Sequence, residues 1–82
     1  MSKKEQEIFS VLKELIVDIL PVSKEEIHLE AHFIHDLQAE SLDIVDLMMG
    51  IEERYDITIK DEHAERILTV QNAVDYILEY VD

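Results

Sequence analysis

The chain has 82 residues, with 20 Asp or Glu against seven Lys or Arg, so its formal net charge at pH 7 is −13. This charge excludes nucleic acid, because a phosphate backbone requires a basic footprint, and it favours partners with basic surfaces. The absence of cysteine excludes disulfides and thiolate metal sites. No apolar run is long enough for stable membrane insertion, and the opening MSKKEQE has no apolar signal core, so we expect a cytoplasmic protein.

The first segment, from Lys3 to Leu20, has the pattern of an amphipathic helix. Ile8, Leu12, Leu15 and Ile19 repeat at intervals of three and four residues. Pro21 follows, and proline disfavours helical geometry in the residue before it, so we expect the helix to end there.

A long connection runs from Pro21 to about Glu40. Ser23 and Glu26 have capping-box spacing, which predicts a short helical turn. We expect the scattered apolar residues to hold this loop on the core: Ile27, Leu29, Phe33, Ile34 and Leu37. The loop also contains His28, His32, His35 and Asp36, whose spacing fits no standard zinc pattern, so we expect surface histidines and no metal site.

The next predicted helix, from Ser41 to about Tyr55, has two apolar stripes. The first suits a core and consists of Ile44, Leu47, Met48, Ile51 and Tyr55. The second consists of Leu42, Val45 and Met49, and Asp46, Glu52 and Glu53 border it. This second stripe is either additional core or an exposed strip with a carboxylate rim, which is typical of a partner-binding surface.

The remaining residues predict one short and one longer helix. Ile57 and Ile59 alternate with polar residues, so a short extended piece is expected there. Asp61 to Ile67 predicts a short helix, and Thr69 predicts the N-cap of a final one. The apolar face of that last helix comprises Val70, Ala73, Val74, Ile77, Leu78 and Val81. The chain is therefore expected to be all-α: one domain spanning 1–82, a small four-helix bundle of three longer helices and one short, with a long first loop.

Ser41 lies between Glu40 and Asp43, immediately before a helical pattern. A nucleophilic serine needs an adjacent base and an oxyanion hole, and no such context is present in the sequence. A helix N-terminus favours an anion, so a phosphodiester on Ser41 would be tolerated. The spacing alone favours the simpler interpretation, in which Ser41 is an N-cap.

The longer stretch of sequence around Ser41 bears on the role of this residue. The sequence DLQAESLDIVDLMMGIEERYDITI, with DEHAERILTVQNAVDYI after it and EEIHLEAHF before it, resembles the acyl carrier protein family over nearly the whole chain. The family pattern around its modified serine is typically Leu-Gly-Ala-Asp-Ser-Leu-Asp. Leu37, Ala39, Ser41, Leu42 and Asp43 are in register with it.

The resemblance implies a non-enzymatic carrier with 4′-phosphopantetheine on Ser41, transferred from coenzyme A by a phosphopantetheinyl transferase. The arm would hold acyl chains as thioesters and present them to enzymes of fatty acid or related biosynthesis. It implies a monomer whose recognition face meets basic patches on those enzymes through Leu42, Asp43, Val45, Asp46, Met49, Glu52 and Glu53. It also implies a cavity for the acyl chain, lined by Phe33, Leu47, Ile51, Ile59, Ala64, Ile67 and Ala73.

Three positions depart from the family pattern. Gln38 replaces a glycine that reaches left-handed geometry cheaply, and Gly50 replaces a typical alanine. Glu40 replaces aspartate, a much better N-cap, so we expect the Ser41 hydroxyl to be drawn into the cap role. These departures leave open a specialised carrier for polyketide, lipid or aminoacyl chemistry. An unmodified acidic helical adaptor is the alternative from another class.

Overall fold

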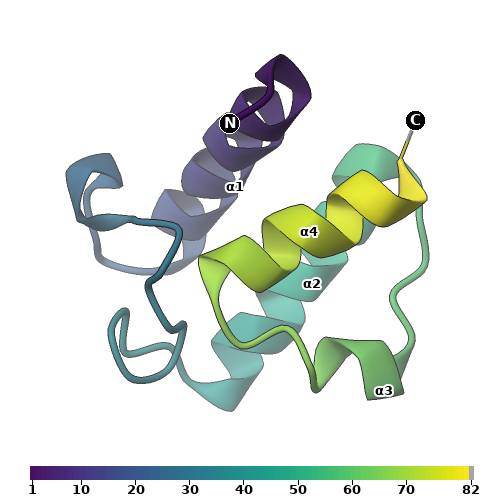
Figure 1. Ribbon diagram of the computed structural model, residues 1–82. Helices are drawn as coiled ribbons and strands as arrows, with labels where there is room; N and C mark the ends of the chain where they lie inside the picture. The colour runs from purple at the N-terminus through teal and green to yellow at the C-terminus, as the bar shows by residue number, and fades with distance from the viewer. Residues whose placement is uncertain (82) are drawn as a thin grey trace.

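A computed structural model describes residues 1–81. The described part of the chain is helical and contains no strand, and its elements follow one another in the order shown in Figure 1. They are α1 (Lys3–Ile19), the 3₁₀ turn η1 (Lys24–Glu26), α2 (Ser41–Tyr55), α3 (Asp61–Ala64) and α4 (Val70–Tyr80). The predicted all-α bundle of three longer helices and one short is confirmed. Within residues 1–81, none of the helices is long and apolar enough to cross a membrane.

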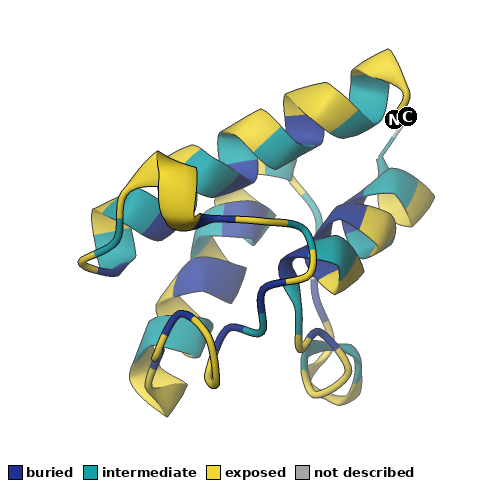
Figure 2. Ribbon diagram, turned by 60° about the vertical axis from the view of Figure 1, so that its left-hand side comes forward, coloured by how far each residue is buried: buried dark blue, intermediate teal, exposed yellow. Residues whose placement is uncertain are grey.

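Helix α1 packs against both α2 and α4. Ile8, Leu12 and Ile16 are its buried residues and share one face, which Figure 2 shows as the dark inner side of the helix. Burying a side chain of this size stabilises a fold by roughly 1.5–3 kcal/mol. At the far end of the bundle, Lys4 Nζ donates to the Val81 carbonyl at 2.9 Å. The beginning of α1 therefore lies beside the end of α4.

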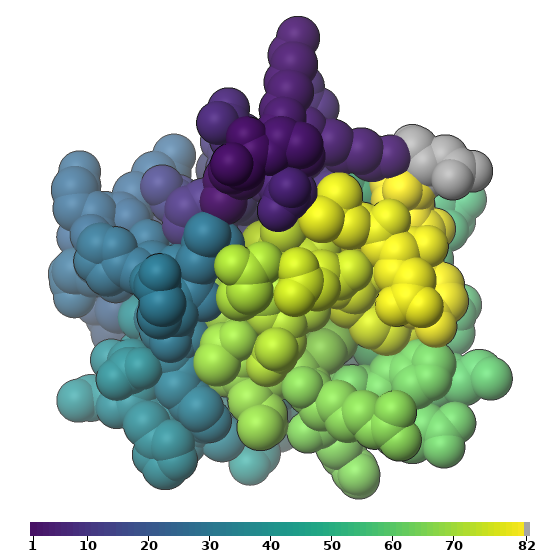
Figure 3. All heavy atoms as spheres, in the orientation of Figure 1, coloured from purple at the N-terminus to yellow at the C-terminus, as the bar shows by residue number. Residues whose placement is uncertain are grey.

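The long loop between α1 and α2 is held against the start of α4 by backbone hydrogen bonds. The Val70 N–H donates to the Ala31 carbonyl at 3.0 Å, and the Phe33 N–H donates to the Leu68 carbonyl at 3.0 Å. Figure 3 shows the loop (blue) packed directly beside this part of the chain (yellow-green). Ile27, Phe33 and Leu37 are buried as predicted.

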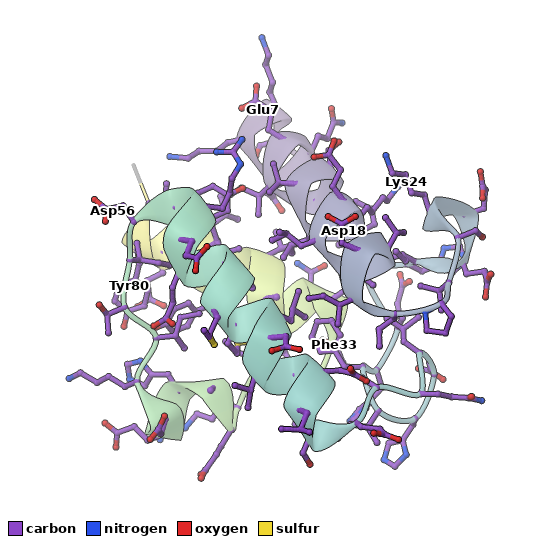
Figure 4. The ribbon with its side chains drawn as sticks, turned by 180° about the vertical axis from the view of Figure 1, so that it is seen from behind. Glu7, Asp18, Lys24, Phe33, Asp56 and Tyr80 are labelled. Carbon is purple, nitrogen blue, oxygen red and sulfur yellow. The ribbon has the colours of Figure 1, made fainter. Side chains whose placement is uncertain are left out.

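Ile34 differs from the prediction for the loop. It was expected to help hold the loop on the core, but its side chain is 48% exposed. Its neighbour Phe33 already occupies the interior, and Figure 4 shows Phe33 beside the first turns of α2. Ile34 follows Phe33 directly in the turn and is left at the surface.

The segment between α2 and α4 also differs in detail from the prediction. The extended piece predicted at Ile57 and Ile59 stays a prediction; the Ile59 N–H donates to Glu52 Oε2 at 2.7 Å. Helix α3 ends at Ala64, three residues before the predicted end, because the chain continues in tight turns such as the bond from the Ile67 N–H to the Ala64 carbonyl. Thr69 caps α4 as predicted, with its side chain accepting from the Asn72 N–H at 3.1 Å.

Candidate functional site

Ser41 is the first residue of α2 and is exposed. The N-cap is Glu40, whose backbone is extended (φ −94°, ψ 168°) and whose carbonyl accepts the first helical bond from the Ile44 N–H. The expectation that the Ser41 hydroxyl takes the cap role is therefore wrong. Asp43 supplies the missing polar contact instead, because its Oδ2 accepts from the Glu40 N–H at 3.0 Å. The Ser41 hydroxyl is left free for chemistry.

The turn before Ser41 requires an unusual backbone. Gln38 has φ 59°, in the left-handed region that a residue with a Cβ disfavours. This matches the expectation that glycine geometry is needed at this position. The turn is closed by the Ala39 N–H, which donates to the Phe33 carbonyl at 2.9 Å, and the Ala39 side chain is buried. These contacts fix where α2 begins and hold Ser41 at the surface.

An open groove of about 320 Å³ lies directly beside Ser41. The loop forms one wall, the start of α2 another, and the residues around the end of α3 a third. Most of its lining is apolar: besides Ser41 it comprises His32, Phe33, Ile34, Ile44, Ala64, Glu65, Ile67 and Leu68. The exposed Ile34 and Leu68 thus have a common location, which the helical periodicity of the sequence could not indicate because both residues lie in loops.

Three of the seven predicted cavity residues, Phe33, Ala64 and Ile67, line this groove. The other four are buried in the core, and the prediction that all seven enclose a shelter for an acyl chain stays a prediction: Leu47, Ile51, Ile59 and Ala73. Phe33 and Leu47 also border a gap of about 10 Å³ between α1 and α2, which has room for about one water molecule. An acyl chain would need the side chains there to move apart.

The second stripe of α2 is exposed. Leu42, Val45 and Met49 expose 75%, 53% and 51% of their surface, and Figure 4 shows the outer side of α2 uncovered by any other element. The alternative in which this stripe is additional core is excluded. An exposed strip of three large apolar side chains on one helix is the arrangement expected of a protein-binding surface.

The carboxylates along this stripe are not equivalent. Asp46 and Glu53 are exposed, whereas Asp43 and Glu52 are half-buried. Asp43 accepts from the Glu40 N–H, and Glu52 accepts from the Ile59 N–H. The structure therefore gives these two acids a part in the fold as well, since each fixes the backbone at one end of α2.

Within residues 1–81, no group of three or more His, Cys, Asp or Glu side chains is arranged to hold a metal ion. His32 instead caps a turn, because its Nδ1 accepts from the N–H groups of Ile34 and His35, each at 3.2 Å. The sequence did not predict this role, in which a histidine at the start of a turn accepts from the N–H groups two and three residues later.

Comparison with known proteins identifies the family of this chain. Residues 10–77 match the family model described as a phosphopantetheine attachment site. An acyl carrier protein of Petrotoga mobilis (strain DSM 10674 / SJ95) is 48% identical over 73 residues, which cover 89% of this chain and 86% of that protein. The fold and the match together define a carrier domain that holds a covalently attached 4′-phosphopantetheine. The chain belongs to the acyl carrier protein family, and it is a carrier for acyl-processing enzymes, not an enzyme itself.

The residues present fit such a prosthetic group. Ser41 has a free, exposed hydroxyl at the positive end of α2, where backbone N–H groups stabilise an anion. The adjoining groove is wide and mainly apolar, so it suits a long flexible arm and its cargo. When attached, the group supplies a thiol that forms thioesters with acyl chains, and the chain's own residues orient and expose it.

Proposed function

We propose that Ser41 is the attachment point of 4′-phosphopantetheine, and that the protein carries acyl intermediates as thioesters for fatty acid or related biosynthesis. One observation carries the proposal: the Ser41 hydroxyl is exposed, free of a capping bond, and located at a helix N-terminus beside the apolar groove. Asp43 and the Glu40 backbone do the capping that would otherwise occupy it.

The outer face of α2 is proposed as the surface that acyl-processing enzymes and the phosphopantetheinyl transferase recognise. Leu42, Val45 and Met49 would supply its apolar centre. Asp46 and Glu53, both exposed, would pair with Lys and Arg of those partners and speed the encounter more than they strengthen the complex. Asp43 and Glu52 would contribute their charge while keeping their backbone bonds.

The groove beside Ser41 is proposed as the entrance for the acyl chain. Phe33 and Ile67 separate it from the core, where Leu47, Ile51, Ile59 and Ala73 lie. A modest shift of these side chains would admit the first carbons of an acyl chain, and the burial of each methylene would stabilise the bound chain by about 0.8 kcal/mol. We further propose one domain spanning 1–82 that acts as a monomer in the cytoplasm, where coenzyme A can supply the arm.

Intact-mass measurement tests the attachment. The protein is incubated with coenzyme A and a phosphopantetheinyl transferase, and we expect a gain equal to one phosphopantetheine group. The gain should vanish in Ser41→Ala and persist in Ser23→Ala, a matched control because Ser23 is also exposed at the start of a helical turn. No gain with several transferases would favour the unmodified adaptor.

A further inference from the structure

His32 lies on the same groove as Ser41 and is held in one orientation. Its Nδ1 accepts from the N–H groups of Ile34 and His35 at 3.2 Å each. Its own N–H donates to Asp36 Oδ2 at 2.7 Å, and its backbone forms a bridge to Thr69. Both the main chain and the ring of this residue are therefore fixed before any arm is attached.

These contacts determine which ring nitrogen carries the proton. A nitrogen that accepts two hydrogen bonds cannot also hold a proton, so neutral His32 has its proton on Nε2. The Nε2–H is therefore a donor on the side of the ring away from the turn. Besides Ser41, the polar side chains lining the groove are His32 and Glu65. The Glu65 side chain has no N–H group, so His32 alone offers an N–H donor from a side chain there.

We propose that His32 is a positioning residue for the prosthetic group, with its Nε2–H donating a hydrogen bond to a phosphodiester oxygen of the group on Ser41. The proposal rests on the proposed attachment at Ser41. Hydrogen bonds to an ionised acceptor are about twice as strong as those between neutral groups. The bond would draw the arm toward the groove from its first atoms and offset the repulsion of the nearby carboxylates.

Acidic residues around His32 oppose the binding of a phosphodiester, and the proposed hydrogen bond must compete with them. Asp36 binds the His32 main chain, Glu65 lies across the groove, and Glu40 precedes Ser41. The ring of His35 lies against that of His32, with centroids 4.3 Å apart and the planes tilted by 43°. On the side of α4, the backbone of His32 pairs with Thr69, the residue before that helix, whose side chain carries no charge. His35 is therefore the other histidine of this cluster, and it must be controlled for.

The phosphorus-31 resonance of the arm provides a direct test. A phosphodiester gains or loses no proton between about pH 5 and 8, the range in which histidines titrate. An inflection of its chemical shift in that range therefore reports a histidine close to it. We expect the inflection in the phosphopantetheine-bearing protein, its persistence in His35→Gln, and its loss in His32→Ser.

Serine is the informative substitution because its hydroxyl can still accept the two backbone bonds of the turn while offering no donor that reaches the arm. His32→Asn, whose amide oxygen can also accept them, serves the same purpose if the serine variant does not fold. Long-range proton–nitrogen spectra give a second readout: His32 should show the Nε2–H tautomer before attachment and a shifted Nε2 resonance after it.

The outcomes separate this proposal from the proposed function. If no phosphorus resonance and no mass gain appear, the attachment itself is wrong. A phosphorus resonance that lacks the inflection, or keeps it in His32→Ser, would overturn the role of His32 and leave the attachment at Ser41 intact. A proton on Nδ1 in the unmodified protein would overturn it as well.

Discussion

Replacing Gln38 by glycine should stabilise the protein. Gln38 has φ 59°, and the left-handed region costs a residue with a Cβ about 1–2 kcal/mol. Glycine removes this strain, but it loses more conformational freedom on folding, and this loss lowers the gain in stability by about 0.5–1 kcal/mol. The net expectation is roughly 0.5–1 kcal/mol, which corresponds to about 2–8 °C in Tm for a domain of this size.

Thermal unfolding followed by circular dichroism checks this value, with Gln38→Ala as the matched control. Alanine removes the same exposed side chain but keeps the Cβ, so it should leave Tm nearly unchanged. Asp56, at φ 55° after α2, provides a graded comparison. Aspartate tolerates left-handed geometry better than glutamine, so Asp56→Gly should gain less. A Gln38→Gly variant no more stable than Gln38→Ala would refute the reasoning that backbone strain is stored in this turn.

Four further expectations follow from the structure. Glu40→Asp should add a side-chain cap to α2 and stabilise the fold by about 0.5–1 kcal/mol in denaturant titration. We expect Ser41 to be modified at equal rates in both forms; a faster rate in Glu40→Asp would indicate that capping and attachment compete for the Ser41 hydroxyl. Gly50→Ala should raise Tm, because helix propensity gains about 1 kcal/mol and the added Cβ lies 3.4 Å from the nearest side-chain atom of α1. Burial raises the pKa of the Tyr76 phenol. Its neutral form therefore stabilises the fold below about pH 10, and this stability is lost as pH rises further. The free energy of unfolding, measured from pH 8 to 11, should depend less on pH in Tyr76→Phe. Added salt should raise Tm through screening of the charge of −13, and a melt indifferent to ionic strength would contradict self-repulsion.

Much of the fold could be predicted from the sequence because its helices are strongly periodic. Ile8 and Leu12 of α1 and Ile77 of α4 are buried as the spacing indicates, whereas Leu15 and Ile19 are only half-buried and Ile16, beside them, is buried instead. The end of α3 could not be placed from the pattern, because Ile67 is apolar and buried whether it lies in a helix or in a turn. The same ambiguity applies to Ile59, whose backbone partner turned out to be a distant carboxylate.

The site was predictable in part. Leu42, Val45 and Met49 are exposed on one face, as a partner-binding stripe requires. The capping of α2 was predicted wrongly, because residue preferences describe the N-cap side chain and miss the bond in which the Glu40 N–H donates to Asp43 Oδ2. The roles of Ile34, Leu68 and His32 depend on how the long loop meets the turn before α4. No local pattern encodes that contact.

Acyl loading on Ser41 tests the central claim most directly. The phosphopantetheine-bearing protein is charged with an acyl group and its intact mass is measured before and after treatment with hydroxylamine, which cleaves thioesters. We predict a second mass gain equal to the acyl group, removed by hydroxylamine, and absent from Ser41→Ala carried through the same steps. Acylation that resists hydroxylamine, or that appears equally in Ser41→Ala, would contradict the account of this protein as an acyl carrier acting through Ser41.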